Sequence, residues 1–348
     1  MAAEAVEPVA TAPLLNVQRL TTAFRVGDGW HAAVRDVSFT LGANETLALV
    51  GESGCGKSVT AMTIMRLLPE HGSRVESGRV LLGDVDLLAL DEAGADRIRG
   101  NRIAMIFQEP MTALNPVLPV DFQVAEPLLA HRGLGREAAL DIAVELLDRV
   151  GIPAARRRAS SYPHEFSGGM RQRVMIAMAL ACGPEVLLAD EPTTALDVTI
   201  QAQVLGLLAE LKAERSMGML LITHSLGVVA AVADRVAVMY AGEIVEQAPV
   251  ATLFDTPRHP YAEGLLRAIP RADRRAATLQ SIPGAVPAID RMPGGCRFEP
   301  RCPLARPLCR EQPPPLRPLA ADAAHRVRCW VRGDAEPGAG AHGSGAPR

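Results

Sequence analysis

The sequence predicts an α/β protein whose parallel sheet is covered on both faces. Residues 47–50, 186–189 and 219–222 are short apolar runs, each followed by polar residues or by a helical pattern. A glycine-rich loop at residues 51–58 joins the first run to a helix, and an Asp-Glu pair at residues 190–191 ends the second. Apolar runs without alternation are typical of strands buried on both faces of a parallel sheet.

Other segments of the chain also carry patterns of strands and helices. Residues 14–50 alternate apolar and polar positions twice, which predicts antiparallel strands. Residues 58–68 carry an apolar stripe at helical spacing, and residues 103–107 form another short strand. Residues 110–182 contain helical patterns broken by prolines, which indicates a helical insertion, and residues 237–246 predict a hairpin around Ala241-Gly242.

Composition excludes several classes of protein. The chain has 348 residues and a net charge of −3, so it has no overall basic field for nucleic acid. No apolar run approaches the roughly 20 residues that span a bilayer. The N-terminus lacks the pattern of a secretory signal. We therefore expect a cytoplasmic protein that binds no nucleic acid and reaches a membrane only through a partner.

The loop GESGCGKS has the composition and context of a phosphate loop. Gly51, Gly54 and Gly56 allow the backbone to wrap around phosphate without Cβ clashes, and successive N–H groups provide a positive concavity. Lys57 is predicted to reach the β- and γ-phosphates, and Ser58 to ligate Mg²⁺.

The acidic pair Asp190-Glu191 follows four apolar residues, so a buried strand presents both carboxylates at its carboxyl end. We expect Asp190 to bind the hydration shell of Mg²⁺. Glu191 is predicted to orient or polarise the attacking water as a general base.

A second phosphate site is predicted at Ser167-Gly168-Gly169, which precedes the helical run MRQRVMIAMALA. Ser167 is a good N-cap, and the two glycines leave the helix N-terminus bare. Two phosphate sites that cannot both contact one nucleotide from a single chain suggest a nucleotide held between two chains.

Taken together, these motifs resemble the ATP-binding subunits of ABC transporters over residues 14–250. The resemblance implies ATP and Mg²⁺ as ligands and hydrolysis to ADP and phosphate. It implies that Gln108 lies near Mg²⁺ and water, that His224 contacts the γ-phosphate, and that Asp197 follows Ala195-Leu196 in a loop that crosses a dimer interface. Catalysis is thus assigned to Glu191, His224 and Gln108.

The resemblance also completes the nucleotide site. Glu52, Ser53, Cys55 and Val59 join the residues around the phosphates, although the Cys55 thiol is assigned no chemistry. Phe24 is predicted to stack on adenine, with Trp30 as the competing aromatic side chain.

Several strings are similar to the oligopeptide, dipeptide and nickel importer subfamily, among them MIFQEPMTALNP at residues 105–116, YPHEFSGGMRQR and His259-Pro260-Tyr261. The methionines after SGG resemble the D-type ATPase of a D/F pair. These features favour a heterodimer with an F-type ATPase over a pair of identical chains, which stays the alternative. The resemblance also implies two permease subunits, an extracytoplasmic binding protein and a peripheral location on the cytoplasmic face of the inner membrane. Peptides are the expected cargo.

Alternatives remain at this point. Nickel or another small solute is the competing cargo. A non-transport ABC ATPase of translation or DNA repair is a different class, disfavoured because the chain has one cassette and no heptads. A binding module without ATPase activity is disfavoured by the presence of Glu191.

Four cysteines near the C-terminus, Cys296, Cys302, Cys309 and Cys329, predict a [4Fe–4S] cluster, which some members of the resembled subfamily carry. Zinc bound by the same thiols and thiols packed in a small core are the alternatives, since the spacing lacks a C-x2-C pair. Arg297, Arg301, Arg306 and Arg310 are available to balance thiolate charge.

The resulting fold prediction is a RecA-like P-loop NTPase core with an antiparallel β subdomain, a helical subdomain and a small cysteine-containing C-terminal region. The predicted boundaries are a disordered lead at 1–13, a nucleotide-binding domain at 14–250 with its helical subdomain at about 95–182, a C-terminal extension at 251–332 and a disordered tail at 333–348.

Overall fold

The computed structural model describes residues 12–193, 196–268 and 282–333. The predicted lead and tail therefore lie mostly outside the described residues, as does Ala195. In the described chain, a large mixed sheet has the strand order β11-β12-β10-β9-β3-β8-β7-β6. Its strands span Arg317–Leu319 (β11), Asp322–Val327 (β12), Glu243–Pro249 (β10), Arg235–Tyr240 (β9), Thr46–Val50 (β3), Gly218–Thr223 (β8), Val186–Asp190 (β7) and Ile103–Ile106 (β6).

The centre of this sheet is parallel and its far edge is antiparallel. Strands β6, β7, β8, β3 and β9 run in the same direction, so their carboxyl ends meet at one edge. Strands β9 and β10 pair around Ala241-Gly242, which confirms the predicted hairpin. Strand β12 then adds to β10, so the C-terminal region extends the same sheet.

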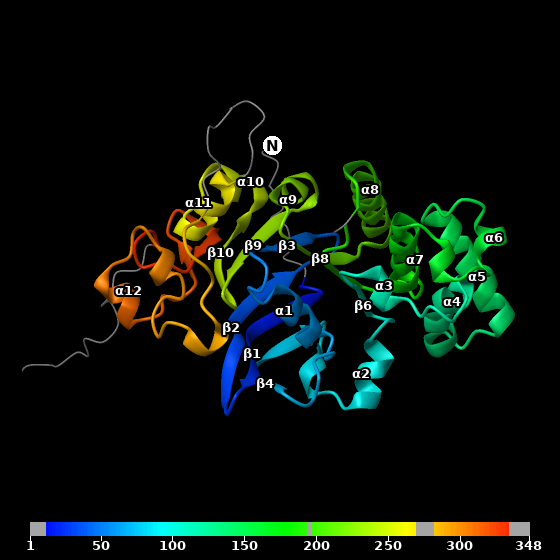
Figure 1. Cartoon of the computed structure of the whole chain (residues 1–348), viewed down its shortest axis with the longest axis horizontal. Coiled ribbons are helices and arrows are strands. Elements are labelled where there is room, and N and C mark those ends of the chain that lie inside the picture. The colour runs from blue at the N-terminus through cyan, green and yellow to red at the C-terminus, as the bar shows by residue number, and fades with distance from the viewer. Residues whose placement is uncertain (1–11, 194–195, 269–281, 334–348) are drawn as a thin grey trace, which may run out of the picture.

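A second sheet confirms the antiparallel pattern predicted near the N-terminus. Its strand order is β2-β1-β4-β5. These strands span Gly29–Leu41 (β2), Leu15–Val26 (β1), Ser73–Leu82 (β4) and Val85–Asp86 (β5). Figure 1 shows this small sheet on one side of the large one, with the helices α4 to α7 at one end of the molecule and α12 at the other.

The helices fill the remaining positions. They span Lys57–Ile64 (α1), Glu92–Ile98 (α2), Pro110–Ala113 (α3), Val120–His131 (α4), Arg136–Arg149 (α5), Ala155–Arg158 (α6), Gly168–Leu180 (α7), Val198–Arg215 (α8), Leu226–Val232 (α9), Val250–Asp255 (α10), Pro260–Arg267 (α11) and Pro307–Glu311 (α12). The range 95–182 assigned to the helical subdomain stays a prediction; within it, β6 pairs with β7 in the large sheet.

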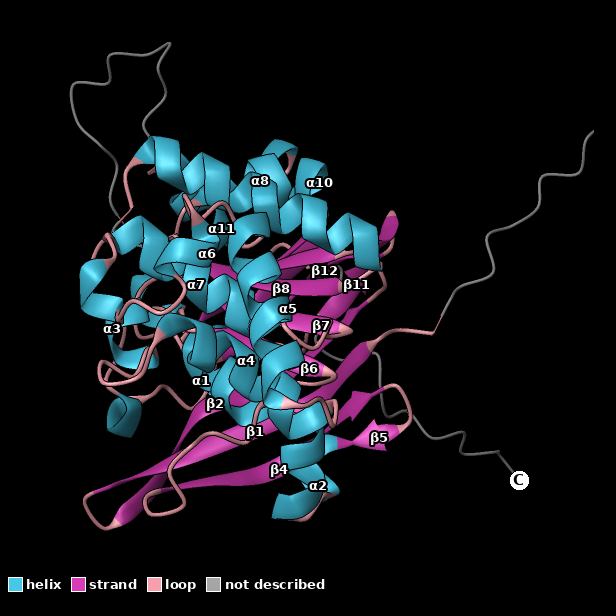
Figure 2. Ribbon diagram, turned by 90° about the vertical axis from the view of Figure 1, so that its right-hand side faces the viewer, coloured by secondary structure: helices cyan, strands magenta, loops and turns pink. Residues whose placement is uncertain are grey.

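Both faces of the parallel strands are buried, as the apolar runs predict. Successive side chains of a strand point to opposite faces. Leu187 accordingly packs in the cluster that includes α4, α5, α7 and α8, while Leu188 packs in the cluster shared with α1 and the small sheet. Figure 2 shows the large sheet with α8 and α10 above it and the small sheet below it.

A third hydrophobic cluster joins the C-terminal region to the sheet. Tyr240 at the end of β9, Tyr261 of α11 and Phe298 are buried together. Their rings lie edge to face or tilted, with the Tyr240 and Tyr261 centroids 4.7 Å apart. Such aromatic pairs add about 1 kcal/mol beyond the area they bury. The C-terminal region is thus packed firmly beside the carboxyl ends of β3 and β9.

Candidate active site

The phosphate loop begins where the buried strand β3 ends, and it leads directly into α1. A Cβ atom on Gly51 would collide with the carbonyl oxygen of Met239 on the neighbouring strand. Gly56 forms the N-cap of α1 and has a φ of 104°, a backbone conformation that residues other than glycine rarely adopt. The two glycines therefore allow the backbone to curl tightly against β9.

Lys57 lies inside this loop. Its side chain is buried, and its Nζ atom donates to the carbonyl oxygens of Gly51 at 2.9 Å and Glu52 at 3.1 Å. These are contacts an anion can replace, because the ammonium group is held by backbone oxygens rather than by a carboxylate. Cys55 is also buried, and burial raises the pKa of its thiol, which agrees with its having no assigned chemistry.

Asp190 ends β7 with its carboxylate beside the loop. The Oδ1 atom is buried and accepts no hydrogen bond from the described residues. Burial raises the pKa of Asp190, while a hydrogen bond with Ser58 and the charge of Lys57 lower it. An unpartnered buried carboxylate oxygen next to a serine hydroxyl is a donor set that fits Mg²⁺.

Glu191, Gln108 and His224 converge at the carboxyl edge of the sheet. The Nε2 atom of Gln108 donates to Glu191 Oε2 at 3.4 Å, and His224 Nδ1 lies 3.2 Å from Glu191 Oε1. The three residues follow β6, β7 and β8, which are neighbours in the sheet. Parallel strand order thus brings together side chains that are far apart in the sequence.

The backbone at Glu191 is strained. Its φ is +46°, an uncommon value for a residue with a side chain, and its N–H donates to the carbonyl oxygen of Ile222 at 2.9 Å. This bond to the end of β8 holds the residue in the left-handed region. Strain of this kind costs on the order of 1–3 kcal/mol and is typical of functional sites.

The Ser167-Gly168-Gly169 segment lies elsewhere. Ser167 caps α7 and accepts a hydrogen bond from the Met170 N–H at 3.4 Å. A Cβ atom on Gly169 would lie 3.1 Å from the side chain of Ile200, and Asp197 caps α8 by accepting from the Ile200 N–H at 2.9 Å. Figure 1 shows α7 separated from α1, with β6 and β8 between them.

Phe24 and Trp30 are the two aromatic residues considered for stacking on adenine, and Trp30 forms a cation–π contact within the chain. The Arg74 guanidinium lies 4.2 Å from the Trp30 ring centroid. Phe24 is half-buried in β1 opposite His31. The stacking of Phe24 on adenine stays a prediction.

The predicted [4Fe–4S] cluster is wrong. In the part of the chain that the structure describes, which includes all four C-terminal cysteines, no group of three or more Cys, His, Asp or Glu is arranged to hold a metal ion. This overturns the iron–sulfur assignment of Cys296, Cys302, Cys309 and Cys329, and the zinc alternative with it.

Burial is the main cause that raises the pKa of Cys296, and the thiols of Cys309 and Cys329 lie close enough to add to it, but Cys296 and Cys329 pack in different hydrophobic clusters and the cysteines do not form a ligand set. Cys296 and Cys302 pack against the third hydrophobic cluster, whereas Cys329 belongs to a small separate cluster and accepts a hydrogen bond from the Val331 N–H. Burial raises the pKa of Cys296 to about 12, so the neutral thiol is favoured there. Wide spacing along the chain indicated a shared site that the packing does not form.

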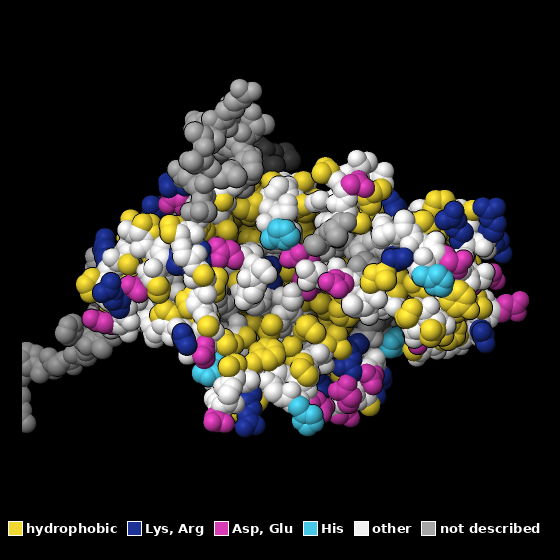
Figure 3. All heavy atoms as spheres, in the orientation of Figure 1, with side chains coloured by type: hydrophobic (Ala, Val, Ile, Leu, Met, Phe, Trp, Pro, Cys, Tyr) yellow, Lys and Arg dark blue, Asp and Glu magenta, His cyan; other side chains and the backbone are white. Residues whose placement is uncertain are grey.

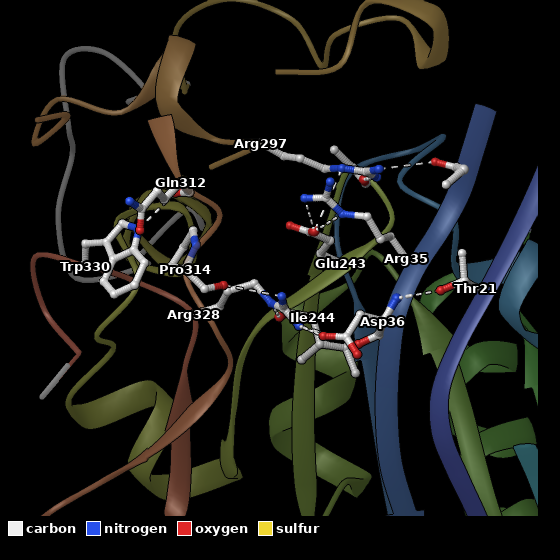
Figure 4. A network of polar contacts seen from close by, with 12 residues as sticks. Thr21, Arg35, Asp36, Glu243, Ile244, Arg297, Gln312, Pro314, Arg328 and Trp330 are labelled. Atoms are coloured by element: carbon white, nitrogen blue, oxygen red, sulfur yellow. Dashed lines mark hydrogen bonds and ion pairs between the residues drawn. The ribbon is translucent and has the colours of Figure 1, made fainter. Parts of the chain in front are cut away.

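Two arginines of this region have other partners. Arg297 is buried, donates to the carbonyl oxygen of Ala241 and lies beside Glu243, as Figure 4 shows. Arg301 forms an ion pair with Glu52 of the phosphate loop. Neither contact was predicted from the sequence, and no local motif signals them, because each joins segments more than fifty residues apart.

The fold and these residues define an α/β ATPase with a phosphate loop. Two family models match the chain: that of the ABC transporter over residues 34–194, and that of the oligopeptide/dipeptide transporter C-terminal region over residues 245–309.

Relatives from two Brucella species align over most of the chain. One from Brucella melitensis biotype 1 is 54% identical over 328 residues, covering 91% of this chain and 96% of its own. One from Brucella suis biovar 1 is 52% identical over 316 residues, covering 91% and 95%. Both carry the name "Putative peptide import ATP-binding protein".

Solved structures of ATP-binding cassettes share this fold. A dimeric post-hydrolysis state of the ATP-binding cassette MJ0796 bound to ADP and Pi has a TM-score of 0.61 at 28% identity and covers 68% of this chain and 98% of its own. CbiO1 from Clostridium perfringens, part of the transporter complex cbiONQ, has a TM-score of 0.59 at 25% identity and covers 70% and 91%. The chain belongs to the ABC transporter family of ATP-binding proteins, in the group with an oligopeptide/dipeptide transporter C-terminal region.

Proposed function

We propose that this chain hydrolyses ATP to power the import of dipeptides and oligopeptides through an ABC transporter complex. The observation that carries the proposal is the convergence of Glu191, Gln108 and His224 beside the phosphate loop. The relatives named for peptide import support the cargo, and they align over nearly their whole length.

In this proposal, the residues of the site divide the work of hydrolysis. The backbone of Gly51, Glu52, Ser53, Gly54, Cys55 and Gly56, the N-terminus of α1 at Val59 and the Lys57 ammonium bind the phosphates. Glu191 accepts a proton from the attacking water. Gln108 and His224 orient the Glu191 carboxylate through their contacts with its two oxygens. The strained backbone of Glu191 keeps the carboxylate at the sheet edge.

Ser58 and Asp190 would hold Mg²⁺, with Gln108 close by. The buried, unpartnered Oδ1 atom of Asp190 supports this assignment. A bound Mg²⁺ neutralises charge on the β- and γ-phosphate oxygens. Asp190 would position the ion through its hydration shell, and Ser58 by direct contact.

A second ATPase chain completes the site in this proposal. Gly169 lies beside Ile200 of α8, Ser167 caps its own helix, and a Cβ atom on Gly168 would meet no neighbouring atom within 4 Å. They are therefore free to bind phosphate on a nucleotide held by a partner chain, and Phe24 to stack on its own adenine. The similar MJ0796 cassette is a dimer in its ADP- and Pi-bound structure. We propose a heterodimer with an F-type subunit.

Two permease subunits and an extracytoplasmic binding protein complete the proposed complex. In the described chain, no helix is long and apolar enough to cross a membrane. Met111 and Val117 are 63% and 74% exposed and follow Gln108 closely in the chain. We propose that this apolar segment docks on a permease at the cytoplasmic face of the inner membrane. Figure 3 shows a further apolar area over α1 and β1.

Uptake measurements test the function. A strain lacking this chain is expected to lose uptake of labelled dipeptides and tetrapeptides while nickel uptake is unchanged. The wild-type chain should restore peptide uptake and the Glu191→Gln variant should not. Loss of nickel uptake with normal peptide uptake would contradict the proposed cargo but keep the ATPase assignment. Normal uptake of both would contradict the transport role.

A further inference from the structure

The C-terminal region reaches the phosphate loop through a bidentate ion pair. Arg301 donates from Nη1 to Glu52 Oε2 at 2.8 Å and from Nη2 to Glu52 Oε1 at 3.1 Å. The Arg301 side chain is 5% exposed and that of Glu52 is 30% exposed. A guanidinium group that donates two parallel hydrogen bonds to a half-buried carboxylate forms a stronger and more specific contact than an ion pair on the surface.

The same region also holds the backbone of Glu52. The Tyr261 hydroxyl accepts a hydrogen bond from the Glu52 N–H at 2.9 Å. Tyr261 is fully buried against Tyr240 and Phe298, so its hydroxyl is fixed in place. The Arg301 guanidinium lies 5.7 Å from the Tyr240 ring centroid, within the same aromatic cluster. The C-terminal region thus binds Glu52 at two points: Arg301 binds its carboxylate and Tyr261 binds its N–H.

The other side of the loop is held indirectly. Arg297 donates to the carbonyl oxygen of Ala241, and the neighbouring Gly242 N–H donates to the carbonyl oxygen of Cys55 at 2.8 Å. Figure 4 shows Arg297 reaching from the C-terminal region toward Arg35 and Glu243. Both flanks of the phosphate loop therefore depend on side chains from beyond residue 250.

The charge of Glu52 makes the ion pair matter for nucleotide binding. The carbonyl oxygen of Glu52 lies 3.1 Å from Lys57 Nζ, so its carboxylate belongs to a loop that must receive polyphosphate. An uncompensated carboxylate there would repel the phosphates and compete for the Lys57 ammonium. Arg301 removes that repulsion.

We propose that Arg301, with Tyr261, is a positioning residue that sets the ATP affinity of the site by neutralising and holding Glu52. The inference rests on the proposed ATP site. It assigns to the C-terminal region a role within the ATPase itself, because the residue that compensates the phosphate loop comes from that region.

The test compares full-length wild type with Arg301→Gln, Glu52→Gln and the double variant. The matched control is Arg310→Gln, which removes an exposed arginine of the same region that pairs with Glu299 at 2.7 Å. ATP dissociation constants are measured by equilibrium binding at low and high salt, with KM, kcat and melting temperature.

We expect Arg301→Gln to weaken ATP binding about tenfold, a coupling of about 1.4 kcal/mol, with kcat within about twofold. Glu52→Gln should change the dissociation constant less than about threefold, and the double variant should resemble it, because the repelling carboxylate is gone. High salt should reduce the defect of Arg301→Gln by screening. Arg310→Gln should bind as wild type.

Wild-type ATP affinity in Arg301→Gln, or an equal loss in Arg301→Gln and the double variant, would overturn the inference. If Arg301→Gln does not fold, Arg301→Lys and Tyr261→Phe replace it. Each should weaken ATP binding about threefold, since one keeps only the charge and the other loses only the backbone contact; wild-type affinity in both would again overturn the inference. Absence of ATP binding by the wild type would instead contradict the proposed function.

Discussion

The Nδ1 atom of His224 lies 3.2 Å from Oε1 of Glu191, although 33 residues separate them in the sequence. The contact exists because both residues follow adjacent parallel strands, β7 and β8, which pair residue by residue. Glu191 is 13% exposed in its side chain and His224 is 62% exposed. The carboxylate is therefore sheltered, while the imidazole is open to solvent.

Replacing Glu191 by glutamine should keep ATP binding and reduce ATP turnover at least about a hundredfold, because the amide cannot accept the proton of water. ATP binding is checked by equilibrium titration and turnover by phosphate release. Glu210→Gln is the control, since Glu210 is exposed on α8. Turnover near the wild-type rate in Glu191→Gln would remove Glu191 from its proposed role.

His224→Ala should lower kcat by about tenfold to a hundredfold with little change in ATP affinity, since we propose that the histidine acts on the Glu191 carboxylate and the reacting phosphate. The double variant with Glu191→Gln should be no slower than Glu191→Gln alone, because residues that act as a unit are not additive. Steady-state kinetics of the four proteins give the result. Fully additive losses would show that the two residues act independently.

Asp190→Asn should stabilise the protein without nucleotide by roughly 1–2 kcal/mol at pH 8, because burial disfavours the charged carboxylate more than its hydrogen bond with Ser58 and the charge of Lys57 favour it. Because the pKa of Asp190 is raised, the folded state holds a proton that the unfolded state has lost at pH values between the ordinary pKa of 3.8 and the raised pKa of the folded state. Stability therefore falls as pH rises through that window in the wild type, and should fall less in the variant.

The same variant tests the Mg²⁺ assignment by urea denaturation. Wild type should gain more stability from Mg²⁺ with ATP than from ATP alone, and Asp190→Asn should lose that difference. Asp141→Asn, an exposed change on α5, serves as the control. A preserved Mg²⁺ effect in Asp190→Asn would contradict the assignment.

His259 should make stability depend on pH on the acidic side. Its pKa is lowered to about 3, first by burial and then by the nearby Arg328 and Arg332. The unfolded chain binds this proton near its ordinary value of about 6.5, so stability is full above that pH and is lost as pH falls toward 3, by up to about 1.4 kcal/mol per pH unit.

His259→Asn is the informative variant for this effect. Asparagine can still accept from the Tyr261 N–H at the start of α11, as His259 Nδ1 does at 3.1 Å. The loss of stability between pH 7 and pH 5, followed by urea denaturation, should be smaller in His259→Asn than in wild type. An unchanged slope would show that His259 does not carry this pH dependence.

The sequence alone predicted the parts of the site that consist of consecutive residues. Gly51 to Ser58 and Asp190-Glu191 carry their chemistry in consecutive residues, and strands with purely apolar runs required a sheet covered on both faces. Gln108 and His224 were predicted through resemblance, because a single amide or imidazole after a strand carries no motif of its own. The cysteines misled for a related reason: their spacing does not report the separate clusters in which Cys296 and Cys329 pack.

The order of the strands in the sheet and the packing of the C-terminal region against the phosphate loop could not be predicted from the sequence. Both depend on contacts between residues that are far apart in the chain. Strand order brought Gln108 and His224 to Glu191, since parallel pairing aligns the carboxyl ends of neighbours. Glu52 and Arg301 meet across 249 residues because the aromatic cluster around Tyr261 carries the C-terminal region onto the loop. The local sequence determines the chemistry that a side chain can perform. Long-range packing determines which other residues that side chain contacts.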